Sequence, residues 1–548
     1  MSVTLSLCAV VARAQEDDVQ RYMRTRMEDL ESDGKLVVQG TPIVAVDFVP
    51  KLYAHMRFKR VWTDPAKVKD LIRAIEDSAK DGLDPEDYGL SQIKALQGKF
   101  ELSSDPTTGA ELDMLLTDAL AELGYHAFYG KVDPERIDQT WNFAQAWKGA
   151  DYIATAVRML NAKSLYNEIE ALKPRAPMYD RFRRTLAKYR AYQAAGGWKP
   201  IASGPSLKVG MKDKRVPEIR HRLAISEDLP KAQDNGSDTY DEELRQGVER
   251  FQKRHRLPAG ELARLTLDAM NVPVEKRIDQ IRLNLERARW ILRDVPERLV
   301  LVNAAAFEIY YMEKDKIVWQ NRAQVGKTFS QTPQYRDDIQ YLVLNPTWTV
   351  PPGVLASTVL PGAKANPGYI KEKNIRVIDP DKGEIEPSKV RWSSYTADNF
   401  PFVLRQDPGP DNALGAIKFM FPNQYHVYLH DTPNQTGYDA RQRAMSWGCV
   451  HVFEPLELAE KLIANPQRWN LDALKKQVAS KKSETVYLDK PVPVMLLYWT
   501  VSVNKEGVTE FIPDVYERDA KVLRALNQGS KVRKGKRRSD EVNKASDE

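Results

Sequence analysis

The segments YHVYLHDTP (residues 425–433) and MSWGCVHV (residues 445–452) combine strand-forming residues with a dense set of reactive side chains. The run from Tyr425 to Leu429 is rich in aromatic and β-branched residues, as is typical of a strand. A polar loop separates the two segments, and together they hold three of the seven histidines and Cys449. We therefore expect a sheet to bring the two segments close together.

Short apolar runs of the same kind lie on both sides of these segments, at residues 299–302, 307–311, 341–344 and 494–497. Gly, Pro, Asn and Asp punctuate the runs, which predicts a β-rich domain, a mixed β-sandwich, over residues 299–519. A long polar stretch at about residues 363–405 interrupts this domain. Loops of that length are usually either functional lids or disordered inserts, and we expect an inserted capping loop there.

The first half of the chain has helical periodicity instead. Val68, Leu71 and Ile75 recur at helical spacing, and similar patterns predict a helical scaffold over residues 46–200. A small helical unit is expected at 205–272 and a connector helix at 277–298. The predicted fold class is therefore a multidomain α+β protein.

Composition and charge exclude several classes of protein. The 548 residues are 42% hydrophobic, which is enough for more than one core, and two cysteines cannot form a disulfide framework. The net charge is only +6, and no apolar run has the ~20 residues that a membrane helix needs. No transmembrane segment is expected.

Both ends of the chain differ from its body. Residues 1–14 are mostly apolar and end in a small-x-small pattern, which predicts a secretory signal peptide whose removal takes Cys8 with it. Residues 529–548 form a basic tail that we expect to be disordered and solvated. The tail has no aromatic residues for base stacking, so no nucleic-acid partner is expected.

Two interpretations compete with catalysis at Cys449. His426 and His430 have zinc-like spacing, but in a strand they would lie about 13 Å apart, too far to share one ion, so no metal is expected. Alternatively, Cys449 is a small buried hydrophobic residue and the histidines are structural. Against this, an exported chain with a single thiol keeps an oxidation-prone group with no structural benefit.

Chemistry at this thiol needs a base, because a free cysteine with a pKa near ~8.5 is mostly neutral at pH 7. His430 is the candidate general base, with Asp431 or a carbonyl fixing its tautomer. The N–H groups of Gly448 and Cys449 are candidates for an oxyanion hole. These roles predict an acyl-thioenzyme, and hence acyl transfer to water or an amine.

The order of His430, fifteen residues, and Ser446-x-Gly448-Cys449-x-His451 resembles the signature of L,D-transpeptidases, which have a YkuD-type catalytic domain. LGAIKFMFPN (residues 414–423) and NPTWTVP (residues 345–351) resemble the large periplasmic YcbB-like branch. VG (209–210), YDEEL (240–244), VERFQKRH (248–255) and TLDAMN (266–271) resemble a peptidoglycan-binding domain. The turn at residues 258–261 departs from the usual pattern of that domain.

The resemblance implies that Cys449 is the nucleophile and His430 the base. It implies that Ser446, Gly448 and Tyr428 shape the pocket, with Trp348 near its mouth. We also expect Tyr428, Trp348, His451, Trp447 and Asp431 to contact substrate. The implied reaction cleaves the bond between the diamino acid at position three and D-Ala at position four of a peptidoglycan stem and forms 3→3 cross-links. No cofactor is implied, and carbapenems are expected to acylate Cys449.

The implied setting is the periplasm of a Gram-negative cell, in cell-wall biogenesis and the maintenance of cell shape, with other wall-synthesis proteins as partners. Two positions depart from the family pattern. Trp447 stands where Ser, His or Lys is usual, and His451 replaces an Arg or Asn. His is charged only below a pKa of ~6.5, which weakens carboxylate recognition there. An L,D-carboxypeptidase, an enzyme that attaches proteins to the wall, and a non-catalytic wall-binding scaffold stay open as alternatives.

Overall fold

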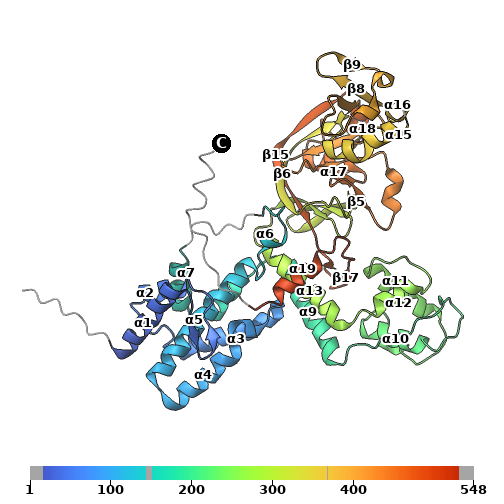
Figure 1. Cartoon of the computed structure of the whole chain (residues 1–548). Helices are drawn as coiled ribbons and strands as arrows, with labels where there is room; N and C mark the ends of the chain where they lie inside the picture. Colours follow the sequence, from blue (N-terminus) through green and yellow to red (C-terminus); the bar gives the residue numbers. More distant parts are fainter. Residues whose placement is uncertain (1–16, 144–150, 367, 530–548) are drawn as a thin grey trace, which may run out of the picture.

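The computed structural model describes residues 17–143, 151–366 and 368–529. The predicted signal peptide and nearly all of the predicted basic tail lie outside these residues. Three parts stand apart in Figure 1: a group of helices from the N-terminal region, a small helical unit, and a β-rich domain that carries a cap. The chain therefore combines helical parts with a β-rich domain, and its fold is a multidomain α+β arrangement.

The N-terminal helices form around α5, whose residues from Gly109 to Leu123 are largely buried. Asp64 and Asp105 cap α3 and α5, and proline follows each of them, which is a typical helix start. Helices already begin at Asp18, well before the predicted domain start at residue 46. The elements are α1 (Asp18–Asp33), β1 (Val37–Val38), β2 (Thr41–Pro42), α2 (Val49–His55), α3 (Pro65–Asp77), α4 (Leu90–Ser103), α5 (Pro106–Tyr129), α6 (Pro134–Ile137), α7 (Tyr152–Asn161), α8 (Leu165–Ala171) and α9 (Pro177–Ala194).

The small helical unit contains α10 (Val216–Ile225), α11 (Glu242–Arg254) and α12 (Arg264–Met270). Its apolar side chains form a core of their own, in which Leu223, Leu244 and Phe251 are fully buried. The helices occupy the stretch where the sequence predicts them.

The predicted connector is a core helix. α13 (Val274–Ile291) is buried along most of its length, and its apolar residues share one hydrophobic core with the N-terminal helices and with strand residues such as Leu299 and Leu497. α19 (Asp519–Leu526) extends beyond the predicted end of the β domain, and Arg287 of α13 pairs with Asp519 at 2.6 Å. The helical part and the β domain are therefore joined by continuous packing rather than by a linker.

The β domain is one nine-stranded sheet whose ends meet. The strand order is β13-β5-β14-β12-β11-β6-β15-β3-β4, and β4 also pairs with β5. The eleven residues of β5 pair along both edges, so the predicted sandwich closes on itself. Its strands are β3 (Arg298–Asn303), β4 (Glu308–Glu313), β5 (Lys316–Gly326), β6 (Tyr335–Leu344), β11 (Ile417–Met420), β12 (Leu429–His430), β13 (Ala444–Ser446), β14 (Val450–Val452) and β15 (Glu484–Leu497).

Further elements cover this domain. Helices α17 (Pro455–Ile463) and α18 (Leu471–Ala479) contribute Leu458, Leu462 and Leu474 to the core inside the sheet. A hairpin of β16 (Val501–Val503) and β17 (Thr509–Phe511) follows β15 and joins the core shared with the helices.

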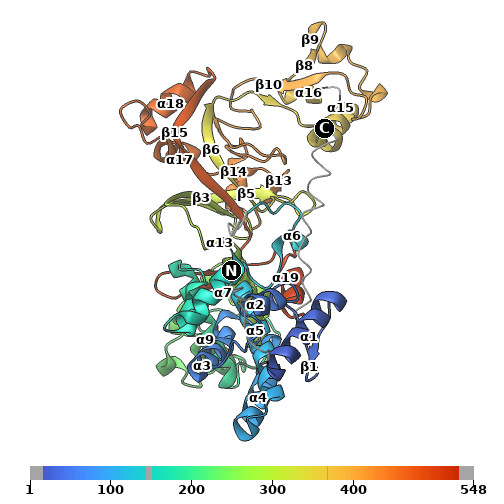
Figure 2. The same ribbon diagram turned by 90° about the vertical axis from the view of Figure 1, so that its left-hand side faces the viewer.

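The stretch predicted as a capping loop is a folded subdomain. A four-stranded sheet of order β7-β10-β8-β9 and three short helices enclose a separate core that includes Ile370, Val377 and Leu404. Figure 2 shows this cap at one end of the β domain. The elements are β7 (Trp348–Thr349), α14 (Pro352–Val354), α15 (Leu360–Ala365), α16 (Tyr369–Glu372), β8 (Ile375–Asp379), β9 (Gly383–Ile385) and β10 (Val403–Gln406).

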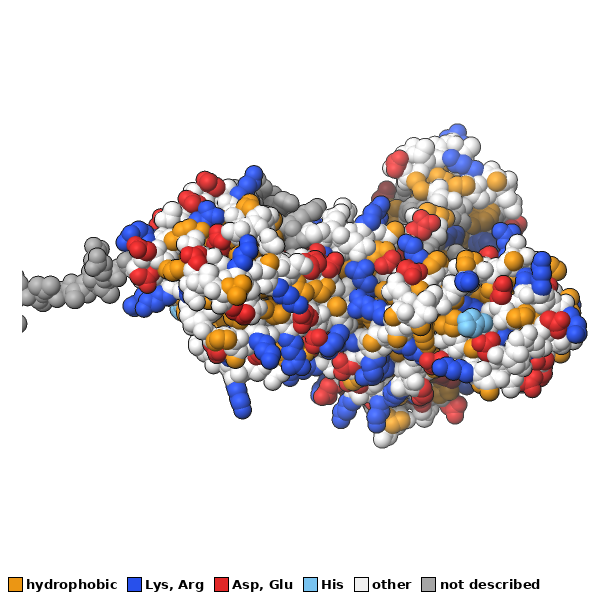
Figure 3. Space-filling view, turned by 90° about the horizontal axis from the view of Figure 1, so that it is seen from below, with side chains coloured by type: hydrophobic (Ala, Val, Ile, Leu, Met, Phe, Trp, Pro, Cys, Tyr) orange, Lys and Arg blue, Asp and Glu red, His pale blue; other side chains and the backbone are white. Residues whose placement is uncertain are grey.

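The charged surface is mixed. Figure 3 shows Lys and Arg interspersed with Asp and Glu over the face that it displays, as expected for a chain with a small net charge. Among the helices that the structure describes, none combines the length and the apolar character needed to cross a bilayer.

Arg256 links the small helical unit to the β domain by two ion pairs. Arg256, which follows α11, pairs with Glu308 of β4 at 2.5 Å and with Glu510 of β17 at 2.6 Å. Beside it, the His255 ring stacks on Phe251 at 3.8 Å and on Phe511 at 5.5 Å between ring centroids.

We predict that Arg256→Met loosens the small helical unit against the β domain, because the change leaves the largely buried Glu308 carboxylate without its charged partner. Small-angle X-ray scattering should then show a larger radius of gyration than for the unchanged chain. Arg264→Met, which removes an exposed charge from α12, is the matched control. An unchanged radius in Arg256→Met would contradict this role.

Candidate active site

The register of two short strands places the candidate reactive side chains on one face of the sheet. β12 pairs in parallel with β14, matching Leu429 with Val450 and His430 with His451. Leu429 and Val450 point into the core, where both are fully buried. Because side chains alternate along a strand, His430, His451 and Cys449 lie on the opposite face. The predicted proximity of the two segments is confirmed.

His430 is held in one tautomer. It is buried, and its Nδ1 lies 2.5 Å from the carbonyl oxygen of Asp431. A carbonyl only accepts hydrogen bonds, so Nδ1 carries the proton and donates, and Nε2 is left to accept one. Burial lowers the pKa of His430 to about 4, and the positive charge of Lys418 contributes to this shift. At neutral pH the ring is therefore a neutral base.

The Asp431 carboxylate is held by hydrogen bonds to neighbouring segments. It accepts hydrogen bonds from the Ala416 N–H at 2.8 Å and from Gln435 Nε2 at 3.2 Å. Gly415 has a φ of +61°, and a Cβ there would lie 2.4 Å from Asp431 Cγ, so only glycine allows this close approach. The tautomer of His430 is therefore fixed by the backbone carbonyl of Asp431 and not by the Asp431 carboxylate.

Cys449 immediately precedes β14. It is half-buried and a free thiol, and its Sγ lies 3.7 Å from the carbonyl oxygen of His426. Burial raises the pKa of the Cys449 thiol, while a backbone hydrogen bond with Tyr428 and the charge of Lys418 act in the opposite direction. Residues 425–428, predicted as strand, form a turn in which the exposed His426 has a φ of +53°.

Ser446 shapes the turn that presents the thiol. Its buried hydroxyl donates to the Cys449 carbonyl at 2.5 Å and accepts the Gly448 N–H at 3.1 Å. Gly448 has a φ of +113°, which a side chain would disfavour. The Gly448 N–H, a candidate oxyanion donor, is thus already bonded, whereas the Cys449 N–H has no partner among the described residues.

Thr332, which the sequence did not single out, anchors the same turn. It is fully buried, and its hydroxyl donates to the Gly448 carbonyl and accepts the Gly326 N–H, both at 2.9 Å. The Tyr516 hydroxyl donates to the Gly326 carbonyl at 2.5 Å. Thr332 lies 116 residues before Gly448, so no local spacing could have revealed this contact.

Arg518, which directly precedes α19, connects Thr332 to Asp138 of the N-terminal helical part. The Arg518 guanidinium donates to Gln331 Oε1 at 3.0 Å and to the Thr332 carbonyl at 3.1 Å. It also lies 3.5 Å from the carboxylate of Asp138, which accepts from Gln334 Nε2 at 2.9 Å. The loop that holds the thiol turn is therefore braced against the helices.

His451 lies beside His430, with ring centroids 4.6 Å apart. Its Nδ1 lies 3.0 Å from Gln324 Oε1, while Gln324 Nε2 donates to the Asn434 carbonyl. The Gln324 oxygen must therefore accept, and His451 Nδ1 donates. Burial lowers the pKa of His451 well below its usual value, so the ring is neutral.

The two tryptophans expected to contact substrate have other neighbours in the structure. Trp447 is exposed and contacts Phe329, with ring centroids 5.5 Å apart, while the Lys327 ammonium lies 4.7 Å from its ring. Trp348 lies in β7 of the cap, paired with Gln406. The sheet face thus unites Cys449, His430, His451 and the half-buried Tyr428.

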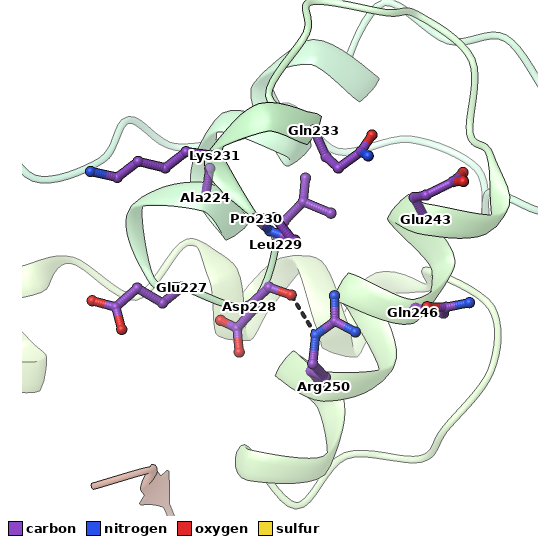
Figure 4. Close-up of a pocket in the computed structure, with 10 residues that line it drawn as sticks. All are labelled: Ala224, Glu227, Asp228, Leu229, Pro230, Lys231, Gln233, Glu243, Gln246 and Arg250. Carbon is purple, nitrogen blue, oxygen red and sulfur yellow. Dashed lines mark hydrogen bonds between the residues drawn. The ribbon is translucent and has the colours of Figure 1, made fainter. Parts of the chain in front are cut away.

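A separate cavity of about 390 Å³ opens in the small helical unit (Figure 4). Leu229 and Pro230 give it an apolar side, and Glu243, Gln246 and Arg250 give it a polar one. Arg250 Nε is held by the Asp228 carbonyl at 2.7 Å. This cavity belongs to a different part of the chain from the thiol.

We predict that Thr332→Val lowers the urea midpoint of unfolding and changes the rate at which iodoacetamide alkylates Cys449. The change keeps the shape of the side chain but leaves the Gly448 carbonyl and the Gly326 N–H unpaired, at a cost of about 1–3 kcal/mol each. Thr332→Ser retains the hydroxyl and should behave like the unchanged chain. Equal behaviour of the Val and Ser variants would exclude Thr332 as the anchor.

Comparison with known proteins identifies two parts of the chain. Residues 47–186 match the family model of a scaffold domain, and residues 297–473 match that of the L,D-transpeptidase catalytic domain, YkuD. A curated Haemophilus influenzae protein named "Putative L,D-transpeptidase" is 30% identical over 258 residues, 46% of this chain and 51% of that protein. The chain thus spans about half the length of this curated relative.

Solved structures with similarity to the chain include an L,D-transpeptidase from Mycobacterium smegmatis, at 11% identity and a TM-score of 0.18 over 37% of this chain and 58% of that one. Another is the L,D-transpeptidase (residues 123–326) from Xylanimonas cellulosilytica, at 12% identity and a TM-score of 0.19 over 54% and 99% of the two chains. From the family models and the curated relative, the β domain of this chain belongs to the YkuD family of L,D-transpeptidase catalytic domains.

Proposed function

We propose that the chain is a peptidoglycan L,D-transpeptidase in which Cys449 is the nucleophile and His430 the general base. The observation that carries the proposal is the shared sheet face, on which His430 has its Nδ1 proton committed to the Asp431 carbonyl and its Nε2 left to accept a proton. The match of residues 297–473 to the catalytic-domain family supports the reaction class.

The first half of the proposed reaction forms an acyl-thioenzyme. His430 Nε2 takes the thiol proton while Sγ attacks the carbonyl carbon of the bond between the diamino acid and D-Ala. Negative charge develops on the carbonyl oxygen, and the Cys449 N–H, which has no partner among the described residues, is the proposed donor to it. The carbon–nitrogen bond then breaks, and His430 gives its proton to the departing D-Ala amine.

The second half transfers the acyl group. The side-chain amine of another stem attacks the thioester carbon, and His430 takes a proton from that amine. The carbon–sulfur bond breaks, His430 gives that proton to Sγ, which restores the thiol, and a 3→3 cross-link remains. Since burial raises the pKa of the thiol and lowers that of His430, the resting pair is neutral and the proton moves during attack.

The remaining parts of the chain fit a role at the cell wall. We propose that the small helical unit (residues 205–272) binds peptidoglycan, for which its separate core and its cavity provide a folded surface. The setting proposed is the Gram-negative periplasm, with wall-synthesis proteins as further partners. The cap, about residues 363–405, would cover the peptide substrate.

Acceptor choice separates this function from its close alternatives. With water as acceptor, the same acyl-thioenzyme makes the chain an L,D-carboxypeptidase, and with a protein lysine it attaches proteins to the wall. If no acyl-enzyme forms, the remaining interpretation is that the chain is a non-catalytic wall-binding scaffold. Digests of peptidoglycan treated with the protein distinguish these outcomes by showing 3→3 dimers, tripeptides, linked protein or no change.

We predict that meropenem adds its mass once to the chain, by acylation of Cys449, and that Cys449→Ala abolishes the adduct. Intact-mass spectrometry gives the measurement, and Cys8→Ser is the control for the other cysteine of the sequence. His430→Ala should slow the adduct strongly because the base is lost. An adduct that persists in Cys449→Ala would refute the nucleophile, and sacculus binding without any adduct would favour the scaffold.

We further predict that alkylation of Cys449 by iodoacetamide rises with pH and has its midpoint above the ordinary thiol pKa of ~8.5. The direction follows from burial, which disfavours the charged thiolate and so raises the pKa of Cys449. Rates measured in a Cys8→Ser chain isolate this thiol. A midpoint near neutral pH would instead indicate a preformed thiolate–imidazolium pair.

A further inference from the structure

A positive charge is needed beside the thiol if the proposed function holds. The donor tetrapeptide ends in D-Ala, so its carboxylate lies only one residue beyond the bond that Cys449 attacks. A carboxylate held this close to a partly buried site needs a cation or several donors. His451 stands where the family usually has Arg or Asn, but it is neutral and its Nδ1–H is already bonded to Gln324.

Lys418 supplies a cation on the same face. In β11 its neighbours Ile417 and Phe419 are fully buried in the core, so Lys418 points to the opposite side of the sheet. Its register partner across the strands is His430. Its Nζ lies 3.9 Å from the centre of the Tyr428 ring, a cation–π contact. Lys418 therefore shares the face that carries His430 and Cys449.

The Lys418 ammonium has spare bonding capacity. Among the described residues it makes no hydrogen bond and no ion pair, although its side chain is half-buried. Burial lowers its pKa, and the nearby Cys449 opposes this shift. The charge of Lys418 in turn lowers the pKa of both His430 and Cys449, so it acts on the two reacting groups.

The other cationic side chains around the site already contact other groups of the chain. Arg322 pairs with Asp439 at 2.6 Å. Arg443 donates to the carbonyl groups of Ala323, Ala440 and Phe307. Lys327 lies between the exposed rings of Phe329 and Trp447.

We propose that Lys418 is the carboxylate-binding residue of this active site, and that its ligand is the free C-terminal carboxylate of a peptide stem, next to the bond that Cys449 attacks. The proposal rests on the function proposed above. It assigns to β11 a recognition role that the family pattern places two residues after the cysteine, where this chain has His451.

The substrate test compares a tetrapeptide with a free C-terminal carboxylate and the same peptide with a C-terminal carboxamide. The unchanged chain should prefer the carboxylate, and Lys418→Met should raise KM for the acid by roughly tenfold with little effect on the amide. Lys418→Arg keeps the charge and should keep the preference. Lys327→Met is the matched control and should leave KM for both peptides unchanged. An undiminished preference in Lys418→Met would overturn the proposal.

A second measurement does not depend on transpeptidase activity. Iodoacetate is an anion and iodoacetamide is neutral, so the ratio of their alkylation rates at Cys449 reports a fixed positive charge near the sulfur. In a Cys8→Ser background this ratio should fall several-fold in Lys418→Met and persist in Lys418→Arg and Lys327→Met. A ratio unaffected by Lys418→Met refutes the proposal. A fall in the ratio without any acyl transfer would uphold the cation at the thiol while refuting the proposed reaction.

Discussion

The parallel pairing of β12 with β14 is the constraint on which the active site depends. One register both buries Leu429 and Val450 in the core and turns His430, His451 and Cys449 to the other face. A slip of one residue would move the apolar side chains out of the core and the reactive ones into it. The same register that buries the apolar side chains therefore also sets the geometry of the site.

Hydroxyl groups bonded to the backbone hold the turn that carries Cys449. The turn at Gly448 is tied by Ser446 within it and by the Thr332 hydroxyl from outside, and Thr332 is in turn held through Arg518. Buried polar groups must find such partners, because an unmet hydrogen bond costs more than a formed one gains. The thiol is therefore supported by segments from distant parts of the chain, including the loop that contacts Asp138 of the N-terminal helices.

Burial also determines the electrostatics of the site. It favours the uncharged forms of Cys449, His430 and His451, so the resting face carries little charge apart from Lys418. A neutral thiol resists oxidation, which suits a chain expected to work outside the cytoplasm. The proposed reaction then separates charge only during attack, when the substrate has displaced water from the face.

The candidate reactive residues, the strand runs around them and most helices could be predicted from the sequence, because these signals are local: periodicity, turn residues and the spacing from His430 to Cys449. It did not reveal the closed sheet, the folded cap or the burial of α13 in a shared core, since each depends on which faces meet in space. The anchoring role of Thr332 and the position of the Lys418 ammonium beside His430 are likewise visible only in the tertiary structure. The first rests on a contact across 116 residues and the second on strand register, and no local pattern encodes either.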